Sequence, residues 1–357
     1  MFDEPSTERI LGYHLIINYP GFPRTLPDAD KYVRSRKFKG INRTIVSRDK
    51  NAAFKPPKVN ERIISHTLTT EEQQVYMSMK DTIKVINERV KRLQLLKDHE
   101  NARRFSSYLL AMVTYLRQSI VCPLLPIANV ALDMCDFEEK SELSSILLKQ
   151  IKSLKLDAWM NDPASVYSSR LRSVVSTFQD HPDERLVAFT CFRTCLDLLK
   201  QHVLTTTDRR PIFTLTSTMS TTSRAKVLND FSKSRNGILM LTYELGAEGL
   251  NLQTSFTIML VDLWWNAGKT QQAIARVLRF GQMSSVVNVY YFTSNTGIEK
   301  AVFDKHEDKL IMLDELKDGP IKSSVKNMRM DQIIAMIANE KNTAQLENIN
   351  KLCKGVK

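Results

Sequence analysis

The stretch FTIMLVDLWWNAGKTQQAIARVLRFGQ, residues 256–282, joins a short apolar run to an amphipathic segment and decides the fold class. The run FTIMLVD is typical of a buried strand, and residues 269–280 are expected to form a helix. Gln272, Arg276 and Arg279 share one side of that helix, because positions three and four apart are neighbours on a helix surface. A guanidinium matches phosphate oxygens with a planar fork of donors. The pair therefore indicates a phosphate site, although such a helix considered alone would favour a solvated basic face.

The same alternation of strand and helix continues on both sides of this stretch. Short apolar runs read LVAFT, PIFTLT, GILMLT and VVNVYYF, and amphipathic helices are expected at 193–204 and 221–233. This rhythm is typical of βαβ units. It predicts an α/β fold with a mostly parallel sheet, helices on both faces and functional loops at the carboxyl ends of the strands.

Upstream, the chain changes character. From Lys58 to Val121 it holds neither glycine nor proline, and its apolar spacing predicts two long helices. Thr69 or Thr70 is the expected cap, since acidic residues follow in the first turn. This segment is predicted to be a helical insertion. A further docking helix is expected within 321–353.

Composition limits the partners. The 357 residues include 51 Lys and Arg against 39 Asp and Glu, a net charge of +12 that favours nucleic acid or an anionic membrane surface. No apolar run approaches the roughly 18 residues of a membrane span, and the first ten residues are acidic and polar. We therefore expect a soluble intracellular protein without a membrane partner. Five cysteines without a CxxC pair predict reduced thiols and no metal site.

The segment GAEGLNLQ, residues 246–253, follows the run GILMLT. Its two glycines are expected where a backbone approaches a phosphate chain closely. Taken alone, this pattern more often marks an ordinary strand-to-loop turn.

Together these motifs resemble the second motor lobe of the Swi/Snf-like family of helicase-related ATPases in superfamily two. RLVAFTCF resembles motif IV, LTSTMSTTSR the DNA-contact motif that follows, TYELGAEGLNLQ motif V, and the QxxxRxxRxGQ spacing motif VI. The resemblance covers about residues 170–300 and implies a RecA-like lobe preceded by the helical insertion. The details are most similar to viral global-transactivator-like proteins and the helicase-like transcription factor group.

The resemblance also implies residue roles. Arg276 and Arg279 would be arginine fingers on the γ-phosphate of ATP, and Gln272 would position them. Gly249 and Asn251 would belong to the nucleotide-binding set, with the Gly249 backbone also facing a DNA strand. The implied DNA contacts are Thr190, Ser217, Thr218, Thr242, Trp264 and Trp265. For the two tryptophans a DNA-facing role, an interlobe role and a place as core anchors all remain open.

Several positions depart from the family pattern, and they predict weaker coupling to DNA with ATP response retained. The departures are Thr216, Ser217, Leu245, Ala247, Ala267, Ala275 and Leu278. Both arginines and the glutamine of motif VI are present.

Nucleotide-holding motifs are not found in the sequence. Gly268, Lys269 and Thr270 fail as a P-loop because Leu263 stands where the first glycine is needed. Asp3 and Glu4 lack the apolar strand that precedes a magnesium-binding acidic pair. ATP and Mg²⁺ are therefore expected to bind mainly to a first lobe that is not present in this chain.

The predicted organisation has four parts: the end of a first lobe at 1–58, a helical insertion at 59–160, a helicase C-terminal domain at 161–310 and a helical tail at 311–357. The leading hypothesis is the second lobe of an ATP-dependent DNA translocase or chromatin remodeler, unable to hydrolyse ATP alone. Its expected partner is double-stranded DNA, in the nucleus or at a viral replication site. Three explanations of the missing first lobe remain open: a fragment of a longer reading frame, a split motor completed by a separate chain that carries the first lobe, or a protein that has lost catalysis and kept binding. The alternative is a non-catalytic nucleic-acid or protein-binding module; a scaffold independent of nucleic acid ranks last.

Overall fold

A six-stranded parallel sheet forms the centre of the computed structural model. The structure describes residues 57–126, 168–206, 208–247, 250–265, 267–279, 281–300 and 302–303, with Ile334 and Ile337. The strand order is β1-β6-β5-β2-β4-β3. The strands are β1 (Lys58–His66), β2 (Leu186–Thr190), β3 (Ile212–Leu215), β4 (Ile238–Thr242), β5 (Thr257–Leu260) and β6 (Val286–Ser294).

The central strands are apolar along their whole length because both faces of the sheet are covered. Every residue of β2, β4 and β5 is buried, the pattern expected of parallel strands between two helical layers. Neighbouring side chains on β2 enter different cores: Ala188 lies in one and Phe189 in the other. The predicted α/β class is therefore confirmed.

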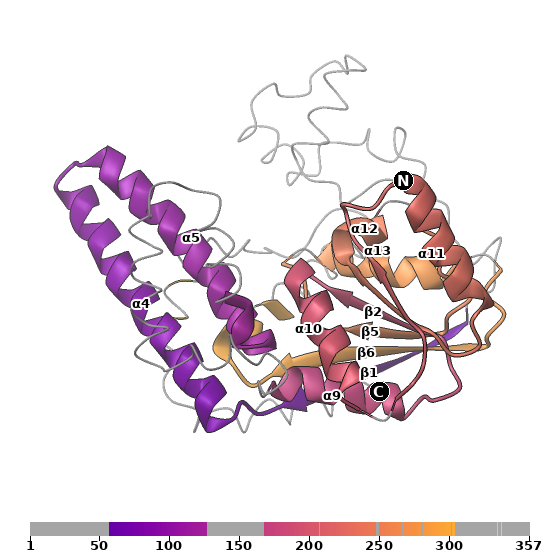
Figure 1. Ribbon diagram of the computed structural model, residues 1–357. Coiled ribbons are helices and arrows are strands. Elements are labelled where there is room, and N and C mark those ends of the chain that lie inside the picture. The colour runs from indigo at the N-terminus through magenta and orange to yellow at the C-terminus, as the bar shows by residue number, and fades with distance from the viewer. Residues whose placement is uncertain are drawn as a thin grey trace, which may run out of the picture.

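Helices cover the sheet on opposite faces (Figure 1). The helices α9 (Ser169–Gln179) and α10 (Arg193–Leu204) pack on one face, and α11 (Thr221–Lys233), α12 (Tyr243–Ala247) and α13 (Ala267–Val277) on the other. The predicted helices at 193–204 and 221–233 are confirmed to the residue. The helix predicted at 269–280 begins and ends earlier.

Two long helices, α4 (Thr70–Leu95) and α5 (His99–Val121), form the predicted helical pair and project from one end of the sheet (Figure 1). Thr69 is the N-cap of α4 and forms a capping box with Glu72. At the turn between the helices, Lys97 has a φ of +58° and Asp98 caps α5. The cap expected at Thr69 or Thr70 is therefore Thr69.

The base of this hairpin is bonded to the first helix of the sheet layer. Glu72 accepts hydrogen bonds from the amide of Ser169 at 2.7 Å and from its hydroxyl at 2.6 Å, while it also caps α4. Ser168 caps α9 and donates its hydroxyl to the carbonyl of Val121 at 2.7 Å. One buried carboxylate thus serves two helix starts.

The strand β1 was not anticipated. It pairs in parallel with β6 over nine residues at the edge of the sheet, although it falls inside the segment predicted as a helical insertion. Its sequence KVNERIISH lacks the apolar run that marked the other strands. The predicted domain limits at 1–58 and 311–357 fall largely outside the described residues. Of the predicted docking helix, Ile334 and Ile337 are described, and both are buried in the core that contains residues of α4, α5, α9 and α10.

Candidate functional site

The carboxyl ends of all six strands lie at one edge of the sheet, because the strands are parallel. Thr190 and Thr242 are partners in register at the ends of β2 and β4. Ser217 and Thr218 follow β3, and Trp264 and Trp265 follow β5. The structure therefore brings the residues predicted to contact DNA to one edge. We call this set of loops, after β2, β3, β4 and β5, the carboxyl edge.

Asp262 joins three loops of the carboxyl edge. Its carboxylate accepts the Thr190 hydroxyl at 2.6 Å and the Cys191 amide at 3.1 Å, and its carbonyl accepts the Tyr243 hydroxyl at 2.7 Å. The side chain is 2% exposed, so these bonds replace water almost completely. Sequence reasoning did not single out Asp262. Its signal was a charged residue that directly follows a buried apolar run.

Thr190 has a different role from the one expected. The residue is 1% exposed, and its hydroxyl donates to Asp262 and accepts the Phe192 amide at 3.2 Å. Both functions of this hydroxyl are used inside the protein, which leaves it no surface for a DNA phosphate. Thr190 therefore holds the loop after β2 in place.

The loop after β3 carries exposed hydroxyl groups. Ser217 and Thr218 are exposed, and the Thr218 hydroxyl lies 3.0 Å from that of Thr216. Arg224 donates to the Ser217 carbonyl at 2.8 Å and so fixes the loop against α11. Thr242, by contrast, is 8% exposed at the end of its strand. The exposed pair fits sequence-independent contact with a phosphate backbone.

Arg276 and Arg279 occupy different environments. The helix α13 ends at Val277, so Arg279 lies in the bend that follows instead of on the same helix side. Arg276 is 4% exposed; its Nε donates to the Gly246 carbonyl at 2.7 Å, and its own carbonyl accepts the Leu252 amide at 3.1 Å. Arg279 is exposed. The shared helix side predicted from spacing is therefore wrong.

Two residues explain why α13 ends early. Gln282 donates its side-chain amide to the Val277 carbonyl at 3.2 Å and to the Ser255 carbonyl at 2.9 Å. Gly281 has a φ of +93°, a conformation that favours glycine. The side chain of Gln282 thus binds a terminal carbonyl of the helix and ties the bend to the start of β5.

Motif V is partly helical. The helix α12 begins at Tyr243, directly after β4, so the expected loop starts later. A Cβ at Gly246 would lie 2.8 Å from Cε1 of Phe189. Packing against an aromatic ring thus restricts position 246 to a residue without a side chain, and its approach to a phosphate stays a prediction. Gly249 lies outside the described residues.

Asn251, a predicted nucleotide residue, follows α12 in the chain and lies near the far end of α13. Asn251 is exposed, and the amide of its neighbour Leu252 is bonded to the carbonyl of Arg276. Gln272 is half-buried midway along the helix. An α-helix of 11 residues is about 16 Å long. The carboxyl edge, with the residues predicted to contact DNA, therefore lies at the start of α13. Asn251 lies near the other end of this helix, and Arg279 lies beyond that end.

Trp264 and Trp265 are half-buried and both contact other side chains. The Trp264 ring meets Tyr243 edge-on at 6.3 Å between centroids, and Lys269 lies 5.7 Å from the same ring. The guanidinium of Arg117, from α5, lies 4.9 Å from the Trp265 ring. Lys269 belongs to the first turn of α13, so the Gly-Lys-Thr triplet forms helix and not a phosphate-binding loop.

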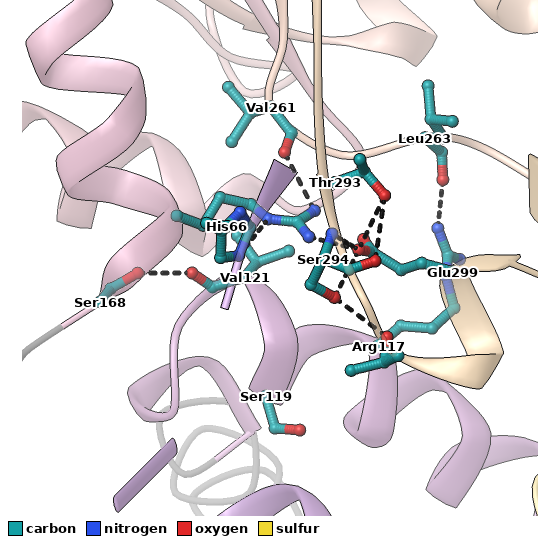
Figure 2. Close-up of polar contacts among 12 residues, drawn as sticks. His66, Arg117, Ser119, Val121, Ser168, Val261, Leu263, Thr293, Ser294 and Glu299 are labelled. Atoms are coloured by element: carbon teal, nitrogen blue, oxygen red, sulfur yellow. Dashed lines mark hydrogen bonds and ion pairs between the residues drawn. The ribbon is translucent and has the colours of Figure 1, made fainter. Parts of the chain in front are cut away.

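A buried ionic cluster lies at the carboxyl ends of β1 and β6, and Figure 2 shows its hydrogen bonds. Arg170 is fully buried; it donates to Glu299 at 2.5 Å, to the Val261 carbonyl at 3.2 Å and to His66 at 3.5 Å. Burial and the Arg170 charge lower the pKa of His66 to about 3. Burial raises the pKa of Glu299, but Arg170 and Ser294 outweigh it and hold that pKa below its ordinary value. The cluster is therefore neutral histidine beside an arginine–carboxylate pair.

Thiols and metals add no further site within the described ranges. Cys122, Cys191 and Cys195 are free, and burial raises the pKa of Cys122 to about 12. No group of three or more His, Cys, Asp or Glu side chains there is arranged to hold a metal ion. Among the described helices, none combines the length and the apolar character that crossing a membrane requires.

Known proteins resemble this chain over the same region. Residues 169–281 match the helicase conserved C-terminal domain. The DNA repair protein RAD5 of Saccharomyces cerevisiae is 33% identical over 156 residues, 41% of this chain and 13% of that protein. RAD5 of Yarrowia lipolytica is 28% identical over 171 residues, 48% of this chain and 16% of that protein. The chain thus spans less than a fifth of the length of these relatives.

A solved structure agrees with the fold. The C-terminal part of the Fun30 ATPase domain matches with a TM-score of 0.52 and 20% identity, covering 80% of this chain and all of that one. The parallel sheet with helices on both faces, together with the domain match, defines a RecA-like C-terminal lobe of a helicase-like ATPase. Over this region the chain is similar to the C-terminal lobe of Swi/Snf-like proteins of superfamily two.

Proposed function

We propose that this lobe is the second half of an ATP-dependent DNA translocase of the remodeler type. One observation carries the proposal: α13 runs from the carboxyl edge, where exposed hydroxyls could contact DNA phosphates, to the bend that holds Arg279, which could contact a nucleotide phosphate. Exposed hydroxyls of Ser217 and Thr218 lie at the carboxyl edge, and the exposed Arg279 lies beyond the far end of the helix. The net charge of +12 favours a polyanionic partner.

Arg279 is the residue best placed to meet the terminal phosphate of a nucleotide. Its guanidinium is exposed and always charged, whereas that of Arg276 is buried. A bound nucleotide would supply the phosphoryl group, and Arg279 would stabilise charge that develops on it. Gln272 on α13 and Asn251 near the end of that helix are the other polar residues that we propose for nucleotide contact. We assign no Mg²⁺ ligand to the lobe and infer that a first motor lobe, on this or another chain, holds ATP and Mg²⁺.

Arg276 would connect the two surfaces. Its bond to the Gly246 carbonyl ties α13 to the segment that leaves β4, and Asp262 ties that segment to the loops after β2 and β5. A shift of α13 on nucleotide binding would therefore reach the loop after β2 through three hydrogen bonds. Such a connected pair of sites is what a motor requires.

DNA binding tests the first half of this proposal. Anisotropy of a fluorescent duplex is measured with the purified chain at several salt concentrations. We expect binding whose logarithmic affinity falls linearly with the logarithm of salt concentration, because neutralised phosphates release counterions. An absence of binding, or an affinity indifferent to salt, overturns the DNA role and favours a protein-binding module instead.

Complementation tests the second half. The chain is mixed with a separately purified first motor lobe of a related protein, and DNA-stimulated ATP hydrolysis is measured. We expect turnover in the mixture only, reduced by roughly 10³-fold in Arg279→Ala. Turnover in the mixture that is unaffected by both Arg276→Ala and Arg279→Ala overturns the arginine assignment. As a DNA motor the protein would act in the nucleus or at a viral replication site.

A further inference from the structure

Arg117 is the residue of α5 that reaches the carboxyl edge. Its Nη2 donates to the Leu263 carbonyl, as Figure 2 shows, and lies 3.7 Å from Sγ of Cys191. Its guanidinium also lies 4.9 Å from the Trp265 ring and 5.6 Å from the Phe192 ring. One side chain thus contacts the loops after β2 and β5 at the same time.

Arg117 contacts the same two loops that Asp262 joins, the loop after β2 and the loop after β5. Cys191 donates its amide to Asp262, and Leu263 is the next residue along the chain. Asp262 fixes the two loops from within the sheet, and Arg117 fixes them from the helical hairpin. The loops are therefore held by two independent side chains of opposite charge.

The chemistry of this position requires arginine. A planar guanidinium can donate in its plane to a carbonyl while its faces lie against aromatic rings. A lysine ammonium is a compact point charge and cannot do both. The charge of Arg117 is used inside the protein, so it is not offered to a DNA phosphate.

We propose that Arg117 is a positioning residue for the loops after β2 and β5 of the carboxyl edge, through which the α4–α5 hairpin sets the geometry of that edge without contacting DNA. The proposal rests on the DNA role proposed above. Loops already held in their binding conformation lose less freedom when a ligand orders them, which increases affinity.

The hairpin has other attachments, so the Arg117 contacts can be removed without releasing it. Glu72 bonds to Ser169, and Ser168 bonds to Val121, at the base of the same helices. Arg117→Ala should therefore fold, and Arg117→Lys, which keeps the charge and most of the stem, provides a second variant. Arg103→Ala is the matched control, because Arg103 is an exposed arginine on the same helix.

Anisotropy of a fluorescent duplex at a series of salt concentrations tests the proposal, with circular dichroism to confirm folding. We expect Arg117→Ala and Arg117→Lys to bind about tenfold more weakly at every salt concentration with an unchanged slope, since no phosphate contact is lost. Arg103→Ala should stay within about twofold of the original protein, the margin for a surface substitution.

Three outcomes overturn the positioning role while leaving DNA binding intact. They are an unchanged affinity of Arg117→Ala, full affinity of Arg117→Lys, or a salt slope reduced by about one, which would mean a direct phosphate contact. If the original protein itself does not bind duplex DNA, the proposed function fails and this inference fails with it.

Discussion

Arg276 and Arg279 stand three residues apart, yet one is buried and bonded and the other is exposed. The difference arises because α13 ends between them, at Val277. A buried arginine that donates to a carbonyl stabilises the fold, whereas the replacement of an exposed side chain changes stability little. The two arginines should therefore differ in their effect on stability.

Substitution of each arginine by alanine should separate these effects. Arg276→Ala leaves the Gly246 carbonyl without its donor, and we expect a loss of about 1–3 kcal/mol in the free energy of unfolding. Arg279→Ala should change it by less than about 0.5 kcal/mol. Urea unfolding of both variants checks this. Equal losses in the two would contradict the assignment of Arg276 to the fold.

Asp262 is the second residue whose side chain decides the geometry of the edge. The Asp262 Oδ1 accepts both the Thr190 hydroxyl and the Cys191 amide, and Oδ2 also accepts the Cys191 amide, at 3.2 Å. In Asp262→Asn the carbonyl can keep the Oδ1 bonds, but the new amide group at the Oδ2 position faces the Cys191 amide, which is itself a donor, and the charge that strengthened these bonds is lost. We expect a loss of about 2 kcal/mol, measured by urea unfolding. Asp197→Asn, on the exposed face of α10, is the control and should leave the unfolding curve unchanged. An Asp262→Asn protein as stable as the control would show that the hydrogen bonds of the Asp262 carboxylate do not stabilise the fold.

At the scale of elements, the helical hairpin and the sheet layer share hydrogen bonds at their boundary. Glu72 accepts the amides of Thr69 and Ser169, so the starts of α4 and α9 depend on one carboxylate. Helix starts have unpaired amides that need such acceptors. The position of the hairpin is therefore set where the helices begin, far from its tip.

Glu72→Ala should loosen both helix starts together. Loss of one cap costs about 1 kcal/mol, and here two starts lose their acceptor. Hydrogen exchange should be faster at the first turns of α4 and α9, with less change at the middle of either helix. Glu71→Ala is the matched control, since Glu71 is exposed in the same turn. Faster exchange confined to α4 would disprove the shared cap.

At the scale of the whole molecule, the buried cluster of His66, Arg170 and Glu299 makes stability depend on pH. The pKa of His66 is about 3 in the folded protein against an ordinary 6.5. Between these values the unfolded chain binds a proton that the folded chain does not, so stability falls as pH falls. The lowered pKa of Glu299 acts in the same direction at lower pH, because its charged form is the bonded one.

His66→Gln should reduce this pH dependence. We expect the free energy of unfolding of the original protein to fall by up to about 1.4 kcal/mol per pH unit below pH 6.5 from this group, and the variant to lack that component. Urea unfolding between pH 7 and pH 4.5 measures it. His99→Gln, exposed at the start of α5, is the control. Identical pH profiles for His66→Gln and the control would contradict the burial of a neutral histidine.

The features predicted well from sequence depend on local patterns. The strands β2 and β4 are continuous apolar runs, and α10 and α11 have helical spacing, so their limits could be read directly. The α/β class and the parallel sheet followed from their alternation. The strand β1 could not be found in this way, because an edge strand needs no apolar run and its partner lies far along the chain.

The sequence predicted which residues lie near the candidate site better than it predicted their positions and hydrogen bonds. Motif spacing located Arg276 and Arg279, but the end of α13 depends on Gln282 and on a glycine with positive φ. The Thr190 hydroxyl and the Arg117 guanidinium are bound to groups 72 and 146 residues away. Such long-range side-chain bonds leave no periodic signal in a sequence.

The pairing of β1 with β6 has a consequence for synthesis on the ribosome. Asn60 and Asn288, partners in register, are 228 residues apart. At about 5–20 residues per second, β6 is made on the order of ten to fifty seconds after β1. During that interval the edge of the sheet is open, and the nascent chain carries a nine-residue strand whose partner does not yet exist. The last step of sheet assembly is therefore timed by translation, and the charged residues of β1 protect it from wrong pairing until then.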